Sequence, residues 1–83
     1  MKRIKPVPNN NGSPRATLVE DMLDARRALL DAVTAMTAAA PHGRDYQHGG
    51  DYPGDWAEAR MRIAQAQELA DAYYQDAIEL QGE

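Results

Sequence analysis

The stretch DWAEARMRIAQAQELADAYYQDAIELQG, residues 55–82, decides how this 83-residue chain folds, because its apolar residues recur in steps of three and four. That spacing places them on one face of an α-helix, where large and small side chains alternate and suit packing against another helix. Asp55 and Glu58 have the spacing of a capping box, and Gly82 is a typical helix end, so the pattern predicts a helix over residues 55–81. The apolar stripe comprises Trp56, Ala59, Ile63, Ala66, Ala70, Tyr73, Ala77 and Leu80, broadened by Leu69, Tyr74 and Ile78.

A second helix is predicted upstream, over residues 14–40. Its apolar stripe comprises Leu18, Met22, Ala25, Leu29, Ala32, Met36 and Ala39, broadened by Val19, Leu23, Leu30 and Val33. Ser13 followed by Pro14 forms a suitable N-cap and first helical residue, since proline lacks the N–H that would be unpaired there. Pro41 and Gly43 end the pattern.

Two helices of equal length joined by a connection over residues 41–54 predict an all-α fold, an antiparallel two-helix hairpin with a long loop. Two helices leave much of each broad apolar stripe uncovered, so we expect the hairpin to dimerise into a four-helix bundle. The residues predicted to form the core or the self-association seam are Leu29, Met36, Ile63, Ala66, Ala70, Tyr73 and Ala77.

The first 13 residues show no helical or strand period. They contain two prolines, a run of asparagines and the cations Lys2, Arg3 and Lys5. We therefore expect residues 1–13 to form a flexible basic arm. Its cations could dock on an acidic partner.

Composition excludes several classes of function. The chain has no cysteine, so it forms no disulfide and has no thiolate metal site or cysteine nucleophile. Between Pro14 and Glu83 there are six basic and 13 acidic side chains, a balance that argues against direct nucleic-acid binding. No stretch approaches the ~20 apolar residues of a membrane span. We therefore expect a soluble, cytoplasmic protein.

The loop holds the polar residues best suited to chemistry, but their spacing matches no known type of site. Asp45, His48 and Asp51 lie three residues apart, which fits neither a closed zinc site nor a calcium-binding loop. Ser13, the only serine, and the three threonines have no neighbour suited to activating a nucleophile. We therefore predict no metal, no cofactor and no catalytic residue.

Aromatic residues in and beside the loop are stronger candidates for a function. Tyr46 and Tyr52 lie in the loop and Trp56 follows in the first turn of the second helix. Tryptophan and tyrosine are enriched at binding hot spots. The alternative is that Trp56 covers the end of the hairpin core and the tyrosines pack over it, and for Trp56 this alternative is favoured.

The segment Ala40-Pro41-His42-Gly43-Arg44-Asp45-Tyr46, between two helices rich in alanine, resembles small helix–loop–helix accessory proteins of bacteriophages and prophages. The resemblance extends over residues 20–80. It implies a non-enzymatic, phage-encoded module that binds and inhibits a bacterial host protein, such as a defence-system component or a regulator. It also implies that Arg44, Asp45 and Tyr46 have a binding or structural role.

Two alternatives stay open at this point. One is a phage structural or assembly protein that acts by self-association alone. The other is an acidic decoy that mimics nucleic acid through the carboxylates that follow Glu68, in a segment that has no Lys or Arg.

Overall fold

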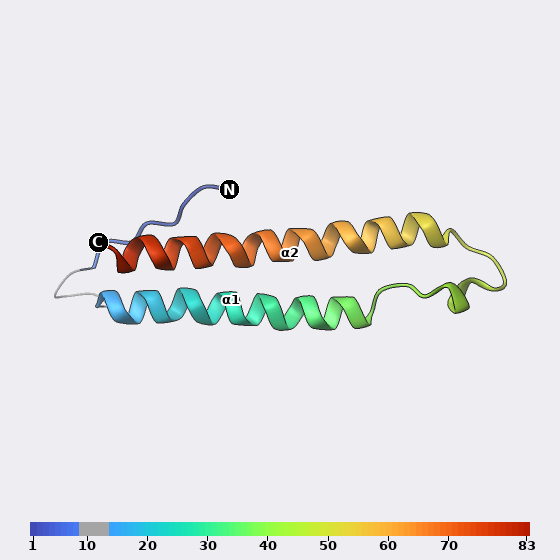
Figure 1. The fold of residues 1–83 in the computed structure, drawn as a ribbon, viewed down its shortest axis with the longest axis horizontal. Coiled ribbons are helices and arrows are strands. Elements are labelled where there is room, and N and C mark those ends of the chain that lie inside the picture. Colours follow the sequence, from blue (N-terminus) through green and yellow to red (C-terminus); the bar gives the residue numbers. More distant parts are fainter. Residues whose placement is uncertain (9–13) are drawn as a thin grey trace.

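The computed structural model describes residues 1–8 and 14–83. Helix α1 spans Arg15–Ala38 and helix α2 spans Tyr52–Gln81, with a single-turn 3₁₀ helix, η1, over Gly43–Tyr46 in the connection. The two long helices pack side by side and antiparallel (Figure 1), giving a rod with extents of 62 × 19 × 17 Å. No strand occurs in the described residues. The prediction of an all-α hairpin is therefore confirmed.

Helix α1 is slightly shorter than predicted at both ends. Its N-cap is Pro14, whose extended backbone places its carbonyl to accept the Leu18 N–H at 3.1 Å. Ser13, the predicted cap, lies outside the described residues. The helix ends at Ala38, two residues before the predicted end, because Ala40 precedes a proline and such residues avoid helical backbone angles.

Helix α2 begins at Tyr52, three residues before the predicted start. Asp51 is the N-cap, and its side chain accepts the Gly54 N–H at 3.1 Å. Pro53 fits in the first turn, where no intrahelical N–H is needed. The Asp55 N–H already donates to the Asp51 carbonyl at 2.9 Å, so the prediction of Asp55 as the cap is wrong.

The main core lies at the end of the rod that holds the N-terminus of α1 and the C-terminus of α2. Val19 and Met22 from α1 pack there against Ala77 and Leu80 from α2, and Leu80 is completely buried. Of the predicted seam, Ala66, Ala70 and Ala77 are buried, whereas Leu29, Met36, Ile63 and Tyr73 are half-buried. Tyr73 packs against the main core, and the other three half-buried residues lie nearer the loop, where the seam is less well covered.

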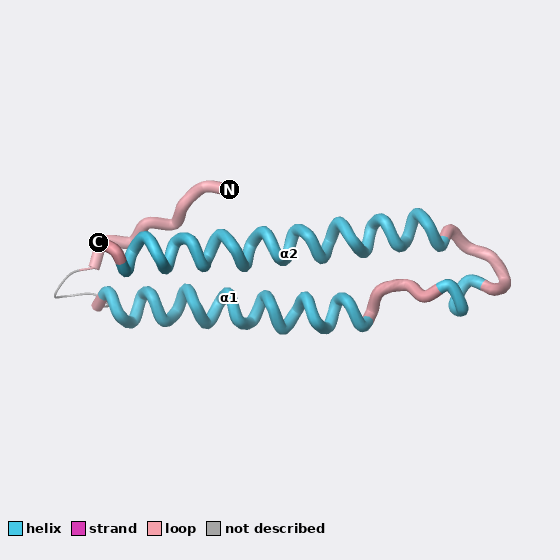
Figure 2. Tube along the Cα trace, in the orientation of Figure 1, coloured by secondary structure: helices cyan, strands magenta, loops and turns pink. Residues whose placement is uncertain are grey.

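The basic arm lies against the outer side of α2, opposite α1 (Figure 2). Arg3 pairs with Glu79 and Glu83, and the Ile4 N–H donates to Asp76. The arm's basic residues thus face the chain's own acidic helix end. We predicted a flexible arm over residues 1–13. Residues 9–13 of that arm lie outside the described residues.

Candidate functional site

The loop end of the hairpin is organised by its two tyrosines. The rings of Tyr46 and Tyr52 lie 5.2 Å apart at an angle of 47°, and both side chains are half-buried. The Tyr46 hydroxyl donates a hydrogen bond of 2.6 Å to Asp55 Oδ2. Because Tyr46 ends η1 and Asp55 lies in the first turn of α2, this bond ties the connection to the helix that follows it.

The hydrogen bond also sets the titration of the tyrosine. Donation to Asp55 raises the pKa of Tyr46 to about 12, with burial and then the negative charges of Asp55, Asp45 and Asp51 acting in the same direction. A phenol that stays protonated remains a donor at every physiological pH. The Tyr46 hydroxyl can therefore donate to Asp55 throughout that pH range.

Two glycines make the turn before α2 possible. Gly49 and Gly50 have φ angles of 125° and 97°, a region that side chains other than glycine rarely adopt. A Cβ atom on Gly50 would lie 2.9 Å from Tyr46 Cδ1, closer than real atoms pack. The turn therefore lets the backbone approach the ring of Tyr46 directly.

The five candidates from the sequence separate into two groups. Tyr46 and Tyr52 are brought together and build the loop. Arg44 and Asp45 are exposed, and Trp56 is 40% exposed, so these three side chains are presented to the outside. The expectation that Trp56 covers the hairpin core stays a prediction, because its side chain is neither fully buried nor fully exposed.

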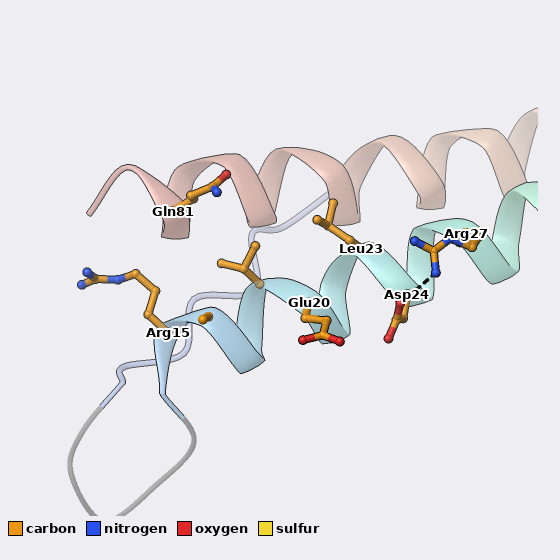
Figure 3. A pocket seen from close by; sticks show the side chains of 8 residues that line it. Arg15, Glu20, Leu23, Asp24, Arg27 and Gln81 are labelled. Atoms are coloured by element: carbon orange, nitrogen blue, oxygen red, sulfur yellow. Dashed lines mark hydrogen bonds and ion pairs between the residues drawn. The ribbon is translucent and has the colours of Figure 1, made fainter.

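A surface groove of about 580 Å³ lies at the opposite end, between the start of α1 and the end of α2 (Figure 3). Val19, Leu23 and Ala16 give it an apolar centre, and Leu23 points toward α2. The charged lining residues are Arg15, Glu20, Asp24 and Arg27, and Gln81 contributes from α2. Asp24 and Arg27 form an ion pair at 3.2 Å.

Exposed apolar side chains continue from this groove along the same side of the rod. On α2, Tyr74 and Ile78 precede Gln81 at helical spacing and are 41% and 43% exposed. On α1, Leu23 is half-buried and packs partly against the core, and Leu30, two turns later, is 36% exposed. The Arg26 guanidinium carbon lies 4.8 Å above the Tyr74 ring and joins the two rows. We call Leu23, Leu30, Tyr74 and Ile78 the apolar flank.

The apolar flank was not among the candidate binding residues from the sequence. Its members form the second row that broadens each apolar stripe, so the available signal was the width of the stripes. Width alone does not show which side a partner helix covers. That information comes from the packing of α1 on α2.

The described residues contain no group of three His, Asp or Glu side chains placed to hold a metal ion. In the same part of the chain, neither helix combines the length and the apolar character needed to cross a membrane. No family model, curated protein or solved structure matches the chain. Function is therefore inferred from the residues and geometry of the chain itself.

Proposed function

We propose that this chain is a non-enzymatic protein-interaction module that binds through its apolar flank. The observation that carries the proposal is the row of large apolar side chains left exposed on one side of the rod, Tyr74 and Ile78 above all. Large apolar side chains left exposed on one side of a small protein are typical of an interaction surface. Charged residues of both signs line the adjoining groove, which matches the apolar centre and polar rim of protein interfaces.

The same surface supports self-association. Only a few large side chains are well buried in the hairpin, so its own core is thin. Two copies that pack flank against flank would form a four-helix bundle with an isologous interface, in which each copy buries the same residues. The proposed assembly is therefore a homodimer.

The resemblance of residues 40–46 to phage accessory proteins extends the proposal to the partner and its location. The module then acts in the bacterial cytoplasm by binding and inhibiting a host protein, such as a defence-system component or a regulator. The exposed loop residues Arg44, Asp45 and Trp56 offer that protein a second contact. If self-association is the whole function, the chain is instead a structural or assembly protein.

The acidic-decoy alternative has weaker support. Of the carboxylates it would use, Glu79 and Glu83 are already paired with Arg3, and Asp76 is buried. A decoy would present these charges to the solvent. By contrast, Leu30, Tyr74 and Ile78 of the apolar flank are already exposed to solvent.

The experiment compares the unaltered chain with Tyr74→Ser/Ile78→Ser and with Met61→Ser. Met61 is 51% exposed outside the flank, so its substitution is a matched control. Light scattering should give a dimer for the unaltered chain and for Met61→Ser, and a monomer for the flank variant. Circular dichroism should show the same helix content for all three.

Affinity capture from bacterial lysate then distinguishes binding of a host protein from a structural role that rests on self-association alone. A host protein captured by the unaltered chain and by Met61→Ser, and lost with Tyr74→Ser/Ile78→Ser, supports host binding. A dimer that captures nothing supports the structural role. A monomer that captures nothing, or equal capture by the flank variant, contradicts the proposal.

A further inference from the structure

The face of α2 that points away from α1 is acidic and is covered by the chain's own arm. We call Glu68, Asp71, Asp76, Glu79 and Glu83 the acidic face; no Lys or Arg occurs from residue 68 to the end of the chain. A groove of about 310 Å³ lies between this face and Met1, Lys2 and Arg3 of the arm. Figure 1 shows the arm on this outer side of α2, so the acidic face and the α1 interface are on different sides of the helix.

Arg3 makes the charged contacts between the arm and the acidic face. Its Nε lies 2.6 Å from Glu79 Oε2 and a terminal nitrogen lies 2.8 Å from Glu83 Oε1. The hydrogen bond to Arg3 lowers the pKa of Glu83, as expected for a carboxylate stabilised in its charged form. The Arg3 side chain is 28% exposed and its two partners are 50% and 40% exposed, so these partly exposed ion pairs hold the arm with only modest strength.

Asp76 adds recognition of the arm's backbone. It is only 6% exposed although it lies on the acidic face, and its Oδ2 accepts the Ile4 N–H at 3.3 Å. Burying a carboxylate is unfavourable unless it is hydrogen-bonded, and the arm supplies this bond. The acidic face therefore contacts a main-chain N–H as well as a cation, which is the chemistry of an extended basic peptide.

The large apolar side chains of the arm add little to this attachment, although Pro6 and Pro8 are half-buried. Met1, Ile4 and Val7 all remain more than half exposed. The arm is thus held mainly by polar contacts that water, salt or a competing cation can replace. A segment held in this way can leave without disrupting the core of the hairpin.

We infer that residues 1–8 form an autoinhibitory strap, which occupies the acidic face in place of an extended basic segment of a partner protein. A partner binds there only when the strap leaves. This surface lies on the side of α2 away from α1, so the inference does not depend on the proposed role of the apolar flank. The partner is defined by its chemistry, a cation beside a free main-chain N–H.

The test uses the 83-residue chain and a fluorescent peptide with the sequence of residues 1–8 as the probe. In the strap variant, Lys2→Ser, Arg3→Ser and Lys5→Ser remove the charges of the chain's own arm. We expect the probe to bind this variant about tenfold more tightly than it binds the unaltered chain, because a tethered segment competes at a high effective concentration. Fluorescence anisotropy measures both affinities at low salt.

Two sets of substitutions, each made in the strap variant, locate the binding surface. Glu79→Gln with Glu83→Gln removes the two exposed carboxylates that pair with Arg3, and we expect binding of the probe to be lost. Asp31→Asn with Glu58→Gln removes the same charge at exposed positions outside both grooves and should leave the affinity unchanged. Circular dichroism confirms that every variant is folded.

Three results would overturn the inference. The first is equal affinity of the probe for the unaltered chain and for the strap variant. The second is undiminished binding after Glu79→Gln with Glu83→Gln. The third is a dimer of the unaltered chain that becomes monomeric with Arg3→Ser alone, because the arm would then be exchanged between two copies.

Discussion

At the terminal end of the hairpin, Val19 and Met22 of α1 pack against Ala77 and Leu80 of α2, and the arm covers the far side of α2. At the loop end, half-buried side chains line the seam, and a tyrosine hydroxyl bonded to Asp55 holds the connection to α2. One end is held mainly by apolar burial and the other by a polar bond and a glycine turn. Although the three-and-four repeat places apolar residues along the whole seam, the buried cluster with large side chains lies at the terminal end, whereas Leu29, Met36 and Ile63 are only half-buried.

The largest effect is expected at the terminal core. Leu80→Ala removes a completely buried side chain and should lower the free energy of unfolding by about 2–4 kcal/mol. Because a chain of this size is only marginally stable, urea denaturation should show much or all of it unfolded. Leu69→Ala, at a position that is 39% exposed, is the control. Equal losses for both would mean that the burial of Leu80 does not stabilise the terminal core.

The next effect is expected in the middle of the rod, where the helices meet through alanines. Ala70 is completely buried, so Ala70→Leu should force the helices apart and cost about 1–3 kcal/mol. Thermal unfolding of this variant is compared with that of Ala57→Leu, which adds the same atoms at an exposed position of α2. An unchanged midpoint for Ala70→Leu would mean that the seam is loosely packed there.

A smaller effect is expected in the glycine turn. Gly49→Ala should cost about 1–2 kcal/mol through its positive φ alone, since nothing lies near its added Cβ. Gly50→Ala should cost more, because its Cβ also meets the ring of Tyr46. Urea denaturation measures both. If Gly50→Ala were the milder change, the ring of Tyr46 would not pack against the turn as described.

The smallest effect at neutral pH is expected for Tyr46→Phe, and it grows in alkali. The folded-state pKa of Tyr46, about 12, lies above the value of about 10 for an unfolded tyrosine. The bond's contribution is therefore fully present below about pH 10 and is lost as the pH rises through about 12. Tyr46→Phe should lose the ultraviolet absorbance step near pH 12, whereas Tyr52→Phe should retain it.

Both helices and their arrangement could be predicted because helical periodicity is a local property of the sequence. The start of α2 could not, because Asp51 and Asp55 both offer a capping carboxylate and Pro53 and Gly54 between them are typical of a turn. The structure resolves this ambiguity through the bond from the Gly54 N–H to Asp51. Because Pro53 and Gly54 are typical of turns, the sequence pattern did not predict that they belong to the first turn of α2.

The remaining contacts join residues that no spacing rule connects. Tyr46 reaches Asp55 only because two glycines adopt positive φ between them. Asp76 is buried by an arm that lies 72 residues away in the sequence and has no periodic pattern. Sequence patterns thus located the aromatic residues and the acidic residues, but not the contacts that each group makes.

Helix α2 is 30 residues long and α1 only 24, so the first turns of α2 lie beside the connection and have no partner helix. Amide hydrogens in those turns should exchange with solvent through local fraying, whereas those near Ala77 and Leu80 should exchange only when the whole hairpin unfolds. Exchange along α2 would then slow progressively from Asp55 toward Leu80. Local unfolding of the hairpin would therefore begin at the loop end and proceed toward the end that contains the main core.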